Sequence, residues 1–368
     1  MPANPNYGTL NLLDTLAAID QANVMEYGED KLYQHISDLL VMHNKHTREM
    51  IDLFVERTTE KVARYGNQAV GGEMVEVDEW GRVDVQKTAV TGHDIGWPLR
   101  SYQYGIGWTK KYFEIKAVAD IAKEFVNAQT ADVRNLRRQI LTGLFRPTNN
   151  TSYIDRLDNQ VTLPLRALIN ADGTTLPMNE YGTTFDGATH THYLARAGGS
   201  LVAADITALV DTVVEHGVNG GQVLLYINKA QEAAISAMAL FDAFQKPLID
   251  PGPGSTADVA AGGRKLNPYN MDDRPIGVWD GYVIVWTKPW IPANYQVAFI
   301  TGGANAKVLR MRRRPVAGYG EYRLVGEHDH FPLRAQHFER EFGVSAWNRT
   351  GAAILYSNGT SYVEPVIA

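Results

Sequence analysis

The feature that most constrains this chain is one continuous amphipathic segment, residues 115–144. Apolar side chains recur along it at three- and four-residue spacing, and charged residues such as Lys123 and Arg138 fall between them. The apolar stripe comprises Val118, Ile121, Ala122, Phe125, Val133, Leu136, Ile140 and Leu144. A helix of this length spans about 45 Å, which exceeds the common globular helix. We therefore expect a structural beam that ends near Pro147.

The N-terminal region is also helical in pattern. Within residues 1–66, the longer of two apolar runs lies between Leu32 and Val62. Residues 1–30 hold five acids and no base, although the net charge of the whole chain is only −6. Two interpretations are open: helices packed on the chain's own core, or an arm that lies on neighbouring subunits. The amphipathic pattern alone favours the first.

A projecting hairpin is predicted before the long helix. Apolar and polar residues alternate from Val75 to Ala89, on both sides of the turn Glu79-Trp80-Gly81-Arg82, and Lys87 is the lysine of this stretch. Glycines on both flanks are typical of hinges. Because an isolated hairpin is marginally stable in water, this one must fold back on its own domain or lie on another molecule.

The rest of the chain mixes helices and strands in an order typical of an α+β fold. In residues 161–305 we expect helices at Val202–His216 and Lys229–Phe244, and strands at Val223–Ile227, Ile276–Trp286 and Val297–Thr301. In the tail we expect strands at Val308–Met311, Tyr319–Val325, Phe331–Phe342, Val344–Trp347, Ala352–Tyr356 and Tyr362–Ile367. Asn358-Gly359 predicts a hairpin between the last two.

Composition excludes several classes of protein. The 368 residues suit two or three compact units, and the absence of cysteine excludes disulfides, thiolate metal sites and a cysteine nucleophile. The first cation is Lys31, so a secretory signal with a basic start is not expected. Apolar runs are too short for a membrane span. We expect a soluble protein that stays where it is made.

The search for catalytic motifs yields little. The glycines at 105–107, 252–254 and 318–320 lack the context of a phosphate-binding loop, and no Gly-x-Ser-x-Gly is present. The carboxylate pairs Asp272-Asp273 and Glu339/Glu341 have nothing in sequence that places them across a cleft. No catalytic residue, cofactor or enzymatic activity is therefore predicted.

Histidine pairs are the best metal candidates. His190 and His192 are spaced by two residues, as are His328 and His330, and such pairs point the same way on a strand. Neither pair has a recognisable third ligand in the sequence, and His35, His43 and His46 lie on one helix side among apolar residues. Satisfied or solvated histidines are the favoured interpretation for all three groups, so no metal is predicted.

One basic cluster stands out: Arg310, Arg312, Arg313 and Arg314, followed by Pro315. It could face the phosphates of a nucleic acid without reading the sequence. Alternatively, it forms ion pairs between subunits, with Glu321, Glu327 or a neighbour's acids as partners. The acidic balance of the chain favours ion pairs.

The order of these parts resembles the major capsid protein of tailed bacteriophages, with the Hong Kong 97 type of capsid fold. The closing segment HFEREFGVSAWNRTGAAI (His337–Ile354) carries most of the likeness in residues, since it looks like that family's closing strand pair. The likeness in architecture covers nearly the whole chain.

The resemblance implies a division into named parts. Residues 1–66 would be the N-arm, 67–113 the E-loop and its flanking strand, 114–160 the P-domain with its spine helix, 161–305 the A-domain, and 306–368 the return strands of the P-domain. In this family the arm and the loop both lie on neighbours, which reverses the preference from the helical pattern alone. The hairpin residues Glu79, Trp80, Gly81, Arg82 and Lys87 would then be assembly contacts.

The resemblance also implies a function. The chain would be a structural subunit that assembles as pentamers and hexamers into an icosahedral shell around double-stranded DNA, built in the host cytoplasm and found in the virion. Its partners would be further copies, the DNA, and scaffolding, portal and decoration proteins, with no membrane. With no obvious scaffolding domain before the arm, a separate scaffolding protein or processing would be needed. The alternatives are an encapsulin-like compartment for protein cargo and a cytoplasmic metal-dependent hydrolase using either histidine pair.

Overall fold

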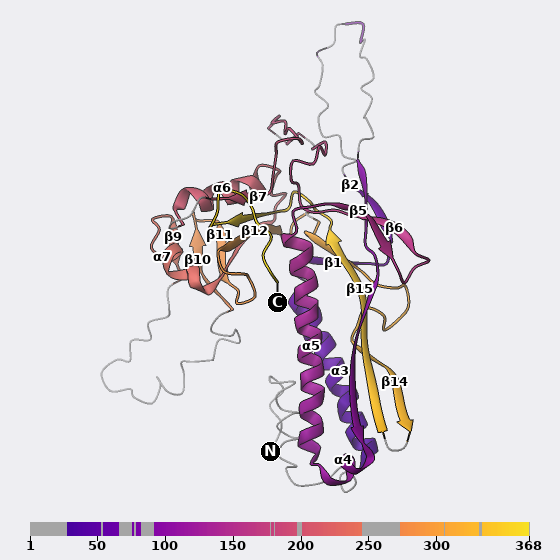
Figure 1. The fold of residues 1–368 in the computed structure, drawn as a ribbon. Coiled ribbons are helices and arrows are strands. Elements are labelled where there is room, and N and C mark those ends of the chain that lie inside the picture. Colours follow the sequence, from indigo (N-terminus) through magenta and orange to yellow (C-terminus); the bar gives the residue numbers. More distant parts are fainter. Residues whose placement is uncertain are drawn as a thin grey trace, which may run out of the picture.

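The structure, a computed structural model, has a long body of helices on a sheet and a smaller body around a second sheet (Figure 1). It describes residues 28–52, 54–65, 76, 79–81, 92–176, 178–179, 181–196, 201–244, 273–304, 306–330 and 333–367. Among the helices of these ranges, none combines the length and apolar content that crossing a membrane requires.

The axis of the long body is α5 (Val118–Phe145), a helix of 28 residues. The predicted long helix is thus confirmed, with its start shifted by three residues. It ends because Arg146 is extended, the conformation favoured before a proline such as Pro147. A short helix, α4 (Lys110–Ile115), precedes it, and the Thr109 side chain caps α4 by accepting from the Tyr112 amide.

The sheet of the long body is built on one long strand, β15 (Leu333–Ala346). It pairs with β4 (Arg100–Thr109) on one side and β14 (Arg323–His330) on the other. Its last residues pair with β13 (Leu309–Arg312), which pairs in parallel with β1 (Val55–Thr58). This strand replaces the two separate strands predicted over 331–347.

The sequence predicts that one strand ends and the next begins at Gly343, but β15 runs through this glycine without interruption. A Cβ at Gly343 would lie 2.0 Å from the Pro98 carbonyl oxygen, so only glycine lets the two backbones approach there.

Helix α3 (Glu29–Ile51) packs on its own chain. Leu32, Ile36 and Leu39 are buried in one apolar cluster with residues of α5, β4 and β15. Beneath them the Asp132 carboxylate of α5 binds His43 of α3 at 2.7 Å and Arg340 of β15 at 2.7 Å, all three buried. The expectation that residues 1–66 lie on neighbouring subunits is therefore wrong for residues 29–51. Their apolar stripe faces α5, as the amphipathic pattern alone indicates.

The smaller body has a seven-stranded mixed sheet with the order β7-β16-β12-β8-β11-β10-β9. Its strands are β7 (Tyr193–Ala195), β8 (Gln222–Ile227), β9 (Phe241–Ala243), β10 (Arg274–Trp279), β11 (Val283–Thr287), β12 (Tyr295–Thr301) and β16 (Ala352–Tyr356). Helix α6 (Ala203–Val214) covers one face and shares an apolar cluster with Val223, Leu225 and Ile227. The alternate residues Leu224 and Tyr226 point to the other face, where they join the cluster that includes the end of α5.

Two predictions for this body are wrong. The helix expected over Lys229–Phe244 is a short 3-10 turn followed by α7 (Glu232–Ser236), because residues 241–243 pair with β10. The strand expected over Ile276–Trp286 is a hairpin, because Asp280 and Gly281 both have positive φ and form a tight turn between β10 and β11.

The predicted hairpin at Asn358-Gly359 is also absent from the described chain, where residues 357–361 form bends and 362–367 form no strand. Instead Tyr362 and Ile367 pack against the core, and the Tyr362 hydroxyl donates to the Phe145 carbonyl at 2.8 Å. The tail thus closes over the end of α5.

Two small hairpins lie at the same end of the molecule as the seam between the bodies. They are β2 (Val62–Tyr65) with β3 (His93–Gly96), and β5 (Asn150–Asp155) with β6 (Val161–Leu165). The predicted hairpin of residues 75–89 lies outside the described residues except at 76 and 79–81.

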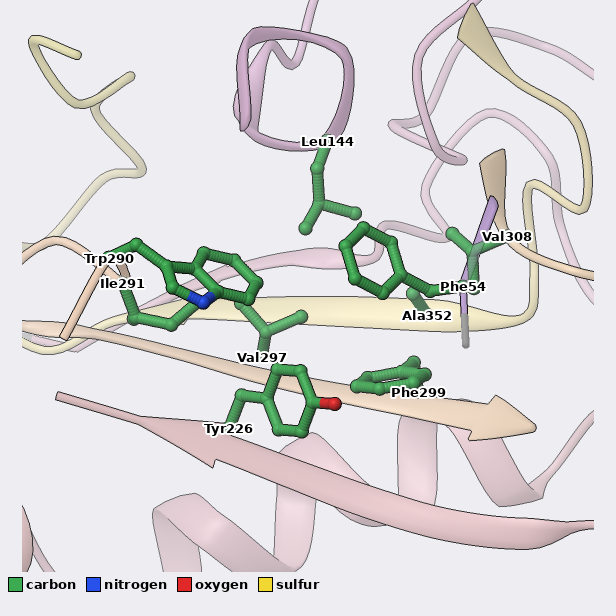
Figure 2. A pocket seen from close by; sticks show the side chains of 9 residues that line it. All are labelled: Phe54, Leu144, Tyr226, Trp290, Ile291, Val297, Phe299, Val308 and Ala352. Carbon is green, nitrogen blue, oxygen red and sulfur yellow. The ribbon is translucent and has the colours of Figure 1, made fainter. Parts of the chain in front are cut away.

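The two bodies share one apolar seam. Figure 2 shows side chains from α5, the segment before β1, and the smaller body converging on one small space. The cavity there has a volume of about 10 Å³. Nine residues line it: Phe54, Leu144, Tyr226, Trp290, Ile291, Val297, Phe299, Val308 and Ala352. The space is too small for more than one water, and the lining apolar surface gives a water little to bind. The seam is therefore a packed core, which joins the bodies rigidly.

Candidate functional site

The basic segment 310–314 begins in β13, beside the last residues of β15, and three of its four arginines bind acids of their own chain. Arg310 of β13 forms ion pairs with Glu56 at 3.0 Å and Glu60 at 3.5 Å. Its guanidinium lies over the ring of Trp347, 3.9 Å from the ring centre, and 5.2 Å from that of Trp97. Cation–π contacts of this kind hold a guanidinium more firmly than an exposed ion pair does.

Arg312 is the most deeply placed of the four arginines. Its guanidinium binds the Asp155 carboxylate at 2.9 Å and the Asp158 carboxylate at 2.6 Å, and donates to the Trp97 carbonyl at 3.1 Å. Asp155 is fully buried and also accepts from the Leu99 amide at 3.1 Å. The hydrogen bonds from Arg312 and Lys61 lower the pKa of the Asp158 carboxyl.

The last two arginines differ from each other. Arg314 binds Glu341 of β15, and this contact raises the pKa of the guanidinium. Arg313 is half-buried and joins no ion pair with any residue that the structure describes. Glu321 and Glu327, the predicted partners, bind elsewhere: Glu321 to Arg48, and Glu327 to Gln336 at 2.8 Å. That choice of partners was wrong, because strand pairing brings acids of distant segments closer than acids nearby in sequence.

The hairpin candidates are only partly described. Glu79, Trp80 and Gly81 form a turn in which Gly81 has a φ of 63° and the Trp80 side chain is 78% exposed. Arg82 and Lys87 lie outside the described residues. Their role as assembly contacts stays a prediction.

A buried arginine that the sequence search missed, Arg349, links the segment before β16 to residues 167–174 and to His93. Arg349 is fully buried, donates to the Ala167 carbonyl at 2.6 Å, and forms an ion pair with Asp172. It also approaches His93 Nε2 at 2.9 Å. Although burial opposes it, the nearby Arg349 charge holds the pKa of Asp172 well below its usual range. Burial, with Arg349 next, lowers the pKa of His93 to about 4. The position of Arg349 between two apolar runs of the sequence was the signal that could have indicated a buried arginine.

The carboxylate pairs do not form a catalytic pair among the described residues. Glu339 binds Arg323 at 3.1 Å and accepts from Gln103 at 2.8 Å, whereas Glu341 binds Arg314. Asp273 binds Lys288 at 2.5 Å, and Asp272 lies outside the described residues. These carboxylates are occupied by structural ion pairs.

The histidine pairs have different outcomes. His190 and His192 lie together with His216, which follows α6, and the three Nε2 atoms are 3.0–3.1 Å apart. The expectation that this pair has no third ligand was wrong, because His216 comes from a segment 24 residues further along the chain. His43 binds Asp132, and His328 and His330 lie on β14.

Comparisons with known proteins identify the fold. The chain is similar to a protein of Mycobacterium phage Patience, with a TM-score of 0.69 and 21% identity over 92% of this chain and 90% of that one. Two further similar structures are the capsid of an empty GTA particle (TM-score 0.45, 13% identity, 85% and 89% covered) and the SrpI encapsulin complex of Synechococcus elongatus (TM-score 0.41, 10% identity, 87% and 90% covered). No family model and no curated protein matches the sequence.

The first of these similarities supports the fold assignment, since it covers nearly all of both chains at a TM-score above 0.5. The predicted α+β class is confirmed, and so, at the level of the fold, is the predicted resemblance to the capsid proteins of tailed phages.

Proposed function

We propose, from the premise that this chain has the Hong Kong 97 type capsid fold, that it is the major capsid protein of a tailed phage. In this proposal it is a structural subunit without catalytic activity. Copies close into pentamers and hexamers, and these build an icosahedral shell around double-stranded DNA. Assembly takes place in the host cytoplasm, with separate scaffolding, portal and decoration proteins as further partners.

The observation that carries the proposal is the likeness to the phage Patience protein over 92% of this chain. A fold by itself is compatible with several functions, so the argument also needs surfaces that suit assembly. Subunits of a closed shell must bury large surfaces against neighbours in rings that close.

Exposed apolar side chains supply one such surface. Ile115 is 76% exposed at the end of α4, and Leu333 is 55% exposed at the start of β15. Both elements reach the end of the long body that is remote from the seam (Figure 1). Leu324 and Val325 on the edge strand β14 are also exposed. An edge strand with apolar side chains is a ready surface for pairing with another chain.

The proposal is tested by imaging the purified chain. We expect large hollow shells by electron microscopy and a particle mass of many subunits by light scattering, with double-stranded DNA in particles isolated from an infected host. A chain that stays monomeric at high concentration and physiological salt, with its own scaffolding protein present, would overturn the proposal. Particles that contain an enzyme and no DNA would instead indicate the encapsulin-like function.

A second experiment tests the hairpin. Deleting residues 76–88 should leave a folded subunit that does not assemble, because an isolated hairpin gains its stability from a neighbour. Circular dichroism and thermal unfolding report the fold, and sedimentation reports assembly. Loss of folding in the unassembled deletion variant would contradict the projecting-loop interpretation.

A further inference from the structure

Three histidines of the smaller body meet at one point with their ring nitrogens directed at one another. The Nε2 atoms of His190 and His216 are 3.0 Å apart, and each lies 3.1 Å from Nε2 of His192. His190 and His192 precede β7, whereas His216 follows α6. Their side chains have exposed fractions of 16%, 0% and 7% for His190, His192 and His216 respectively.

Protons alone cannot satisfy this arrangement. Each Nε2 presents one site in the plane of its ring, either an N–H or a lone pair. A hydrogen bond needs one of each, but around a ring of three atoms the two kinds cannot alternate. At least one of the three close contacts must therefore be between two lone pairs or two N–H groups, which repel. A cation that accepts all three lone pairs removes the conflict.

The surroundings prepare the lone pairs for such a cation. His192 Nδ1 lies 2.7 Å from the Ala352 carbonyl oxygen and donates to it, so its Nε2 carries a lone pair. A hydrogen bond of this kind on the far ring nitrogen is the usual support of a histidine ligand. Burial lowers the pKa of all three rings, that of His216 to about 4, which keeps the imidazoles neutral.

The spacing of the three nitrogens can be compared with a zinc site, and a carboxylate lies beside two of the rings. Glu215 Oε1 is 3.5 Å from His190 Nε2 and 3.8 Å from His216 Nε2. In a tetrahedral zinc site, with bonds of about 2.0–2.1 Å, neighbouring ligand atoms are roughly 3.3–3.4 Å apart. The three nitrogens, 3.0–3.1 Å apart, are near that spacing. Among the described residues, only the three histidines have ligand atoms that all lie within 4.8 Å of one another, so Glu215 is a neighbour of the site and not a fourth ligand.

We propose that His190, His192 and His216 bind one Zn²⁺ ion in a structural site. Three imidazoles are ligands that suit zinc. The three side chains are at most 16% exposed, so a substrate has little access to the ion and its role is structural. Phe185, whose ring centre is 4.3 Å from that of His216, covers it further.

The ion would fasten two segments of the smaller body to each other. One segment leads into β7 and is held by the Ile354 amide, which donates to the His192 carbonyl at 2.8 Å. The other is the turn after α6, where Gly217 has a φ of 92°. Joining them holds α6 against the sheet that it covers, so removing the ion should destabilise this body.

The experiment uses the untagged full-length chain, loaded with Zn²⁺ and then dialysed against metal-free buffer. We expect about one zinc per chain by plasma mass spectrometry, and a melting temperature that falls by roughly 3–8 °C on addition of a strong chelator. His216→Gln should lower the bound zinc at least tenfold. His46→Gln, in an exposed histidine of α3, is the matched control and should retain full occupancy.

Two outcomes would overturn the proposal. One is less than about one zinc per ten chains together with no effect of the chelator. The other is zinc bound equally by His216→Gln and the native chain. If His216→Gln does not fold, Co²⁺ binding to the native chain decides: intense visible absorption indicates a tetrahedral site, whereas weak octahedral absorption or none contradicts it.

Discussion

At the scale of single residues, the Asp155 carboxylate is the point on which several segments depend. It binds Arg312 of β13 and accepts from the amides of Leu99, Leu157 and Asp158, all at 2.9–3.1 Å. A buried carboxylate is stable only while such donors surround it. Arg312 therefore contributes to the fold itself, and its charge is not available to a ligand.

Replacing Arg312 tests this role. Arg312→Ala leaves the buried Asp155 without its counter-charge and should lower the free energy of unfolding by about 3–5 kcal/mol. Arg313→Ala is the matched control and should change it by less than about 0.5 kcal/mol. Urea unfolding of the unassembled variants measures both. Equal effects of the two substitutions would contradict the buried role of Arg312.

His93 makes the stability depend on pH. Its pKa in the folded chain is about 4, against about 6.5 when unfolded, because burial and Arg349 disfavour the cation. Between these values the unfolded chain binds a proton that the folded chain does not, so stability falls as the pH drops from 6.5 toward 4. Discounted for partial exposure, the loss is about 1–2 kcal/mol. His93→Gln should lose that much less between pH 7.5 and 4.5 in urea unfolding with chelator present. An unchanged pH dependence would exclude His93 as the cause.

Residue patterns anticipated some of these sites and missed others. The spacing of His190 and His192 marked a pair, but nothing in the sequence connected it to His216. The arginines of 310–314 were recognised as a cluster, yet their partners Glu56, Asp155 and Glu341 come from three distant segments. The sequence shows which charged side chains require ion-pair partners. Which residues become those partners depends on how the fold brings distant segments together.

At the scale of elements, turn sequences show how context decides. Asp280-Gly281 and Asn358-Gly359 carry the same kind of hairpin signal. The first forms a tight turn because strands on both sides pair with each other. After the second, the chain turns away to cover the end of α5, so its local preference is overruled by burial of Tyr362. The long helix was predictable because its periodicity matches the face that it buries. The strand Ala352–Tyr356 was predictable because it is a short apolar run bounded by turn residues, and it is buried on both faces.

Helix α3 provides a test at this scale. Within the part of the chain that the structure describes, the apolar cluster of α3 and α5 begins at Leu32. Removing residues 1–27 keeps all of these contacts and therefore serves as the reference truncation. Removing residues 1–52 exposes that cluster and leaves Asp132 without His43, which should lower the melting temperature by roughly 10 °C or more. Differential scanning fluorimetry distinguishes the two. Equal stability of both truncations would mean that α3 does not belong to the core.

At the scale of the whole molecule, the two bodies share a seam while each also has a core of its own. Phe54 lies in the seam, with its ring centre 6.0 Å from that of Trp290 and 6.1 Å from that of Phe299. Leu209 of α6 lies instead in the cluster that belongs to the smaller body alone. A core substitution in the seam should therefore destabilise both bodies, whereas one under α6 should destabilise only the smaller body.

Two truncations of core side chains test this difference. Phe54→Ala and Leu209→Ala should each cost about 2–5 kcal/mol. Phe54→Ala should raise amide hydrogen exchange in both β13 and β12, which belong to different sheets. Leu209→Ala should raise it in α6 and β8 but leave β4 and β15 unchanged. Identical exchange patterns would show that the molecule opens as one unit.

The lengths of α5 and β15 have a mechanical consequence. A helix of 28 residues and a strand of 14 span about 42 Å and 46 Å, and they pack side by side over most of that distance. A helix and a strand of similar length that pack along each other resist bending better than either element does alone. A force applied at α4 would therefore move the long body as a rigid unit, with little bending. The displacement would be transmitted along α5 and β15 to the seam at the other end.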